Sequence, residues 1–219
     1  MTGIIGRSAT LVREFAARFT ARRDSEPIET VPELADFVGS RAAFVTQKKL
    51  YGYLKTRMGT RWPTLFEDDV FVASINIAKA QIFAACLADL AVHAAATTGA
   101  GGRLDRAGCA SLAGHVHAEG LAANRDAWPA DIDQRSWAAA FAARVADVNW
   151  DNVAAGGDCF TESPQALVKW APIAPELKKY DAEIVRNSIR YAWIEVRARL
   201  RERLAAEAVA ADWKAGGEA

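Results

Sequence analysis

Apolar residues recur along most of the chain at the three- and four-residue spacing of an α-helix, and neither strand-like alternation nor hairpin turn sequences interrupt them. This pattern predicts an all-α, single-domain helical bundle of about six to seven helices around a central apolar helix at about residues 67–96. We expect residues 30–214 to form the bundle. Residues 1–24 are expected to form a separate basic, amphipathic N-terminal helix.

Residues typical of helix starts and helix ends predict the boundaries of the individual helices in the bundle. Thr30, Pro32 and Glu33 combine an N-cap, an early proline and a capping-box glutamate, which predicts a helix that runs to about Met58. After the apolar central helix, glycine, proline and Asp or Ser N-cap signals set the remaining boundaries. The expected later helices are about 105–124, 131–153, a short one beginning at Ser163–Pro164, and a long one from about 175 to about 211.

Composition narrows the class of protein. Twenty-seven Lys and Arg residues balance 27 Asp and Glu residues, so no global positive field favours nucleic acid, and we expect no nucleic-acid partner. The three cysteines form no Cys-x-x-Cys pair, which favours a reducing compartment over a disulfide framework. Because no secretory signal is recognisable in the first residues, a cytoplasmic location is expected.

Sharp catalytic motifs are missing from the sequence. It contains no Gly-x-Ser-x-Gly elbow, no Walker phosphate loop and no His-Glu-x-x-His helix, so neither an enzyme class nor a cofactor is indicated. Whether the protein is an enzyme stays open at this stage.

Polar residues on otherwise apolar helix faces are the candidate site residues, since an unpaired buried polar group is costly. If the second and third helices are antiparallel, Arg41 lies level with Asp89, which predicts a buried ion pair. Such pairs either fix helix register or anchor a ligand or a reaction between helices. The full candidate set is Arg41, Lys48, Asn76, Lys79, Asp89, Glu195 and Arg199.

Two i,i+4 pairs suggest a further kind of site. Asp89 and His93 share one helix face, and His115 and Glu119 share another, so an antiparallel turn between the two helices would create a carboxylate and imidazole set for iron, manganese or zinc. The alternative is that these histidines only make hydrogen bonds in the core or at the surface.

The leading functional hypothesis is a non-catalytic interaction, adaptor or regulatory protein that docks a protein partner or a second copy through its first or last helix. The alternative is a bundle that binds a small apolar ligand or carries out an unrecognised reaction between its helices. Residues 4–23 place an apolar stripe beside five arginines, which suits packing on the bundle, a protein partner or peripheral contact with an anionic membrane.

Overall fold

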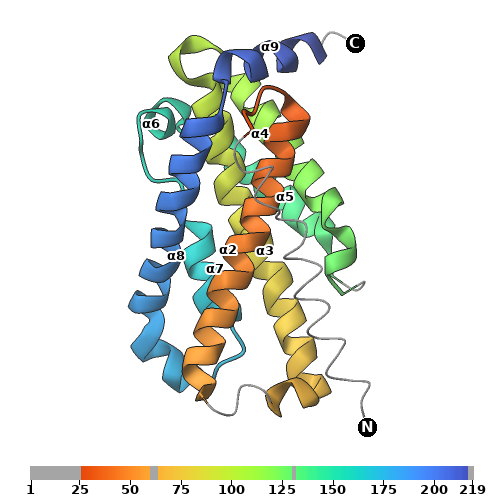
Figure 1. The fold of residues 1–219 in the computed structure, drawn as a ribbon, viewed down its shortest axis with the longest axis vertical. Coiled ribbons are helices and arrows are strands. Elements are labelled where there is room, and N and C mark those ends of the chain that lie inside the picture. The colour runs from red at the N-terminus through yellow and green to blue at the C-terminus, as the bar shows by residue number, and fades with distance from the viewer. Residues whose placement is uncertain (1–25, 60–63, 130–131, 217–219) are drawn as a thin grey trace.

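The computed structural model describes residues 26–59, 64–129 and 132–216, and within these ranges every regular element is a helix (Figure 1). The helices pack against one another around α3, Asp69–Gly99, which runs through the middle of the molecule. The predicted all-α bundle around a central helix is confirmed. The predicted helix within residues 1–24 lies outside the described residues.

The first two described helices begin as the sequence predicts. In α2, Val31–Met58, the Thr30 side chain accepts the Glu33 N–H while the Glu33 carboxylate accepts the Thr30 N–H, so the capping box is formed. A short 3-10 turn at Thr64–Glu67 leads into α3, where Asp68 caps the first turn.

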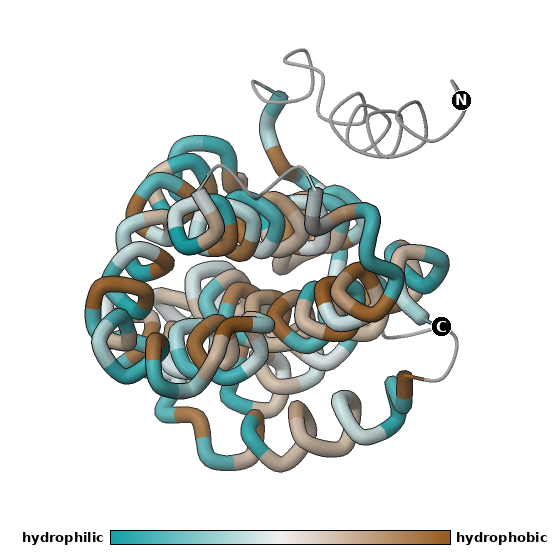
Figure 2. Tube along the Cα trace, turned by 90° about the horizontal axis from the view of Figure 1, so that it is seen from below, coloured by the Kyte–Doolittle hydropathy of each residue, from teal (hydrophilic) through white to brown (hydrophobic). Residues whose placement is uncertain are grey.

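Helix α3 is long and apolar enough, by length and composition, to cross a membrane. In this fold it is the core helix, and every side chain from residue 82 to residue 96 is buried. Helices α2, α4 and α7 make its main contacts. Figure 2 shows this arrangement end-on, with apolar segments inside the bundle and others at its outer edge.

Small residues bring α4, Arg106–Ala123, close to the central helix. A 3-10 turn at Ala100–Gly102 connects the two, and Gly101 in this turn has a φ of 72°, which favours glycine. A Cβ at Gly120 would lie 2.6 Å from the Leu87 side chain. The absence of a side chain at Gly120 therefore allows α4 to pack closely against α3.

The next predicted helix, to about Val153, is wrong in its extent. Helix α5 spans Gln134–Ala146, after a 3-10 turn at Arg125–Ala127, and the short α6, Trp150–Ala154, follows as a separate element. Asn149 explains the break, because its side chain accepts the Asn152 N–H and starts a new helix. Helix α7, Glu162–Trp170, then begins one residue before the predicted Ser163 start.

The final predicted helix is also divided. Helix α8, Pro175–Arg203, ends before Leu204, and α9, Ala206–Gly216, turns away across the top of Figure 1. The cause is long-range, because the Ile28 N–H donates to the Arg203 carbonyl at 2.8 Å and the Ala205 N–H donates to the Ile28 carbonyl at 2.9 Å. The incoming chain therefore takes the backbone groups that a continuous helix would pair internally.

Candidate functional site

Asp89 is the most deeply buried of the predicted site residues, and its partner is different from the predicted one. The carboxylate lies 2.9 Å from an Arg144 guanidinium nitrogen, and it accepts the backbone N–H groups of Glu162 at 3.2 Å and Ser163 at 2.8 Å. Thr161, the residue at the start of α7, makes no side-chain cap. Asp89 therefore caps α7 from a neighbouring helix, and the predicted Arg41–Asp89 pair is wrong because α7 and Arg144 occupy this carboxylate.

The surroundings of Asp89 give it a structural role. Burial raises the pKa of Asp89 to about 6, against the opposing effect of Arg144 and the Ser163 and Glu162 N–H groups. Arg144 also donates to the Cys159 carbonyl at 2.6 Å and lies 3.3 Å from the Glu162 carboxylate. A buried carboxylate with this many partners holds α3, α5 and α7 together.

Arg41, Glu195 and Arg199 come together where α2 meets α8. Burial, followed by the nearby Arg199 and Arg203, lowers the pKa of Arg41, while Glu195 opposes that shift. Arg199 pairs with Glu195 one turn away at 3.1 Å. Glu195 is exposed, whereas Arg41 and Arg199 are half-buried, so this group is a charge network at the edge of the bundle rather than a site inside it. Lys48 is exposed as well, with its ammonium 5.3 Å from the centre of the Phe44 ring.

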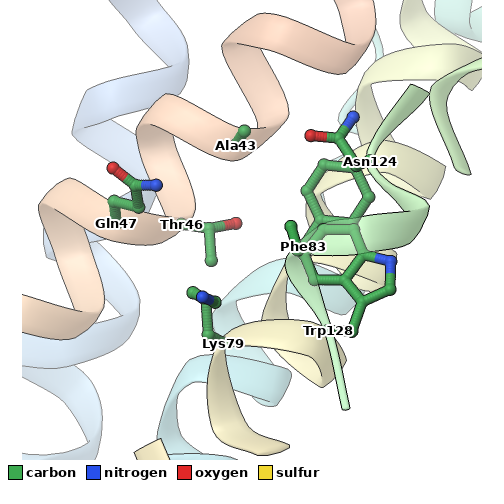
Figure 3. Close-up of a pocket in the computed structure, with 8 residues that line it drawn as sticks. Ala43, Thr46, Gln47, Lys79, Phe83, Asn124 and Trp128 are labelled. Carbon is green, nitrogen blue, oxygen red and sulfur yellow. The ribbon is translucent and has the colours of Figure 1, made fainter. Parts of the chain in front are cut away.

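Lys79 lines a small niche between α2, α3 and the segment after α4. Figure 3 shows Lys79 and Thr46 at its centre, with the aromatic rings of Phe83 and Trp128 on one side. Burial lowers the pKa of Lys79. The niche has a volume of about 10 Å³, which is about the space of one water molecule, so it does not admit a larger ligand. Asn76, one turn earlier, is half-buried and is not part of the niche lining.

The predicted metal set is not assembled. Within the described ranges no group of three or more His, Cys, Asp or Glu side chains is close enough to hold a metal ion. His115 and Glu119 are exposed, and the His115 ring lies 5.4 Å from that of Trp213, whereas Asp89 is buried against α7. His93 is buried with its ring 5.3 Å from the Phe160 ring.

Helix α8 carries a surface that the candidate set did not include. Its inner face is buried through Val185, Ile189, Trp193, Val196 and Leu200, yet a second row of large apolar residues faces solvent. The exposed fractions of this second row lie between 45% and 72%. We call it the outer stripe, and it consists of Leu177, Tyr180, Ile184, Tyr191 and Ile194.

The spacing of the outer stripe is that of a helix-pairing seam. Its members, with Asn187 at the one polar position, follow each other at intervals of three and four residues from Leu177 to Ile194. At 100° per residue they lie nearly opposite the inner face. Helix α8 forms the left edge of the molecule in Figure 1, and apolar segments also line the left edge of Figure 2.

The sequence pattern contains this surface, although periodicity alone does not separate the two faces of the helix. Leu177 and Ile184 share a helical period with Ser188 and Ala192, but the structure exposes the first two and half-buries the others. A second helical-period set, Val185, Ile189, Val196 and Leu200, was the available signal that another face of the same helix fills the core.

A shallow groove between α4 and α5 has a volume of about 540 Å³. Its floor consists of small and apolar residues such as Gly114, Ala118 and Ala142, and the stacked rings of His117 and Phe141, 4.0 Å apart, form part of its wall. Arg125 and Arg135 also contribute to the lining.

Comparisons of the chain with protein-family models, with curated proteins and with solved structures find no match.

Proposed function

We propose that this protein is a non-catalytic interaction protein whose binding surface is the outer stripe of α8. The observation that carries the proposal is a helix with two apolar faces, of which the bundle buries only one. Single exposed apolar residues are ordinary on protein surfaces, whereas a row of five at seam spacing, with one polar position at Asn187, is typical of a helix that docks another helix.

The energetics favour a partner on this surface. Burying one fully exposed Leu or Ile side chain is worth about 1.5–3 kcal/mol, and the stripe residues keep between 45% and 72% of their surface exposed. A partner that covers all five therefore gains on the order of 1 kcal/mol from each, before the cost of association is subtracted.

The proposal is tested by photo-cross-linking in the cells that make the protein. Benzoylphenylalanine is introduced at position 184 or 191 in separate full-length chains, and at Val70, which is 77% exposed on α3, as the matched control. We expect cross-linked adducts from positions 184 and 191 and none from position 70. Adduct yields at 184 and 191 no higher than at 70 would remove the proposal.

A second candidate function is binding of an anionic amphiphile in the α4–α5 groove, because the volume of this groove lies in the range of ligand sites and two arginines contribute to its lining. Gly114 faces open space, so Gly114→Leu fills the groove without a clash in the core. Gly52→Leu on α2, which also faces open space, is the control. Titration with anilinonaphthalene sulfonate should show weaker binding in Gly114→Leu alone, and equal binding in both variants counts against this site.

A further inference from the structure

We infer that the partner of the outer stripe is a second copy of this chain, with the two α8 helices packed antiparallel about a twofold axis between residues 185 and 186. This inference rests on the proposed function, because it names the occupant of the same surface. Three features of α8 support it: the symmetry of the stripe, its flanking charges and its length.

The positions of the outer stripe are arranged symmetrically about the middle of the stripe. About an axis between residues 185 and 186, antiparallel pairing places Leu177 against Ile194 of the second copy and Tyr180 against Tyr191 of the second copy. Ile184 then lies against Asn187 of the second copy, in the two central layers. Each apolar end therefore meets an apolar end, and each tyrosine meets a tyrosine, as a self-complementary twofold interface requires.

The charges beside the stripe also match in this orientation. Glu183 and Arg190 flank the same side of the stripe and are both exposed. In an antiparallel helix pair, flanking positions on the same side face each other, so Glu183 meets Arg190 of the second copy, and the twofold axis repeats the contact. Parallel pairing would instead place Glu176 beside Asp181 of the second copy, which is a contact between two acids, although it would also place Arg190 beside Glu195 of the second copy. The charges therefore favour the antiparallel arrangement.

The length of the seam suits a helix pair. From Leu177 to Ile194 the stripe extends about 26 Å at 1.5 Å per residue, and it lies on one continuous helix of 29 residues. Two such helices can approach to about 8–10 Å along the whole seam, because none of the stripe residues is buried within its own bundle.

Charge reversal tests both the partner and the orientation. The full chain, Glu183→Arg, Arg190→Glu and the double swap are each examined by sedimentation equilibrium over a wide concentration range. We expect the wild-type mass to rise from 23.6 kDa to twice that value. Each single variant should self-associate at least about tenfold more weakly, because two attractive contacts become repulsive. The double swap should restore the wild-type affinity.

Mixing the single variants provides the sharpest result. A chain with Arg at both positions and a chain with Glu at both positions should pair with each other while neither pairs with itself. Far-UV circular dichroism and urea unfolding of each variant at low concentration serve as folding controls. Wild-type self-association that neither reversal weakens, or a mixture that stays monomeric, would overturn the antiparallel pairing.

Other occupants give different results. A wild-type chain that is monomeric throughout, or that dimerises only after residues 1–25 are removed, overturns self-pairing, and so does a monomer that binds anionic vesicles through the stripe. If the chain is monomeric while positions 184 and 191 still cross-link to a different protein, the self-pairing fails and the proposed function stands. If these positions give no adduct at all, both fail.

Discussion

The two faces of α8 differ in what their apolar residues do. On the inner face Trp193 is 1% exposed and donates from its indole nitrogen to the Ser163 hydroxyl at 3.0 Å, which fixes the helix against α7. On the outer face, two residues earlier, Tyr191 is 71% exposed. Both faces carry large apolar residues, but only the inner face packs against the bundle, where Trp193 also makes this hydrogen bond. The other face stays exposed to solvent, and it is the surface that we propose binds a partner.

The largest expected effect on stability comes from replacing one aromatic residue on each face of α8 by alanine. Trp193→Ala should lower the free energy of unfolding by about 3–5 kcal/mol, because it leaves a cavity in the core. Tyr191→Ala should change it by no more than about 0.5 kcal/mol. Urea unfolding at a protein concentration low enough to keep the chain monomeric gives both values. Similar losses in the two variants would mean that the two faces do not differ as described.

A slightly smaller loss of unfolding free energy is expected for substitution of Asp89, which caps α7, the helix packed against the inner face of α8. Asp89→Asn should lower the free energy of unfolding by about 2–4 kcal/mol, because Arg144 loses its buried counter-charge while one capping oxygen remains. Asp151→Asn is the control, since Asp151 pairs with Arg106 in solvent and its loss should cost no more than about 0.5 kcal/mol. Equal costs in the two variants would assign Asp89 no structural role.

Helix α4 carries one buried histidine, His117, and one exposed histidine, His115, and the buried one should affect the pH dependence of stability. Burial, reinforced by Arg144, lowers the pKa of His117 to about 4. Between the unfolded value of about 6.5 and pH 4 the unfolded chain binds the proton more readily, so stability is lost on acidification through this window. Asp89 acts in the opposite sense, because its folded-state pKa is raised to about 6 and its contribution to stability falls as pH rises toward that value.

The His117 contribution is isolated by substitution. In His117→Leu, the loss of unfolding free energy between pH 6.5 and pH 5 should shrink by about 1–2 kcal/mol relative to the wild type. His115→Leu, at an exposed position on the same helix, should leave the loss unchanged. Stability curves from urea unfolding at several pH values give the comparison, and parallel curves for His117→Leu and the wild type would contradict it.

The smallest expected effect on stability distinguishes α2, which is capped by its own N-cap side chain, from α7, which is capped by Asp89 of α3. Thr30→Ala removes the side-chain cap of α2 and should cost about 1 kcal/mol. Thr161 occupies the same position at the start of α7 without a side-chain cap, so Thr161→Ala should cost no more than a few tenths of a kcal/mol. Thermal and urea unfolding distinguish the two, and a larger loss at Thr161 than at Thr30 would be inconsistent with capping by Asp89.

The features that the sequence predicted correctly depend on neighbouring residues. The start of α2 is encoded within four residues by Thr30 and Glu33, and the core position of α3 follows from apolar side chains on all of its faces. The ends of α4 were predicted to within one residue for the same reason, because Asp105 and the preceding glycines are local signals.

The features that sequence reasoning missed depend on residues far apart in the chain. Asp89 was assigned to Arg41, but its partners Glu162 and Ser163 lie 73 and 74 residues away, and no local pattern identifies them. The end of α8 has no Gly or Pro signal, because Ile28 causes it. For the outer stripe, periodicity identifies an apolar face and does not say whether the protein itself buries it.

The contacts near Ile28 have a consequence for how the protein is made. The Val31 N–H at the start of α2 donates to the Asp212 carboxylate at 2.8 Å, and the two residues are 181 positions apart. At a synthesis rate of about 5–20 residues per second, α2 therefore waits about 10–40 s on the ribosome before this contact can form. During that interval the nascent bundle lacks this contact between α2 and α9, which can form only after Asp212 has been synthesised.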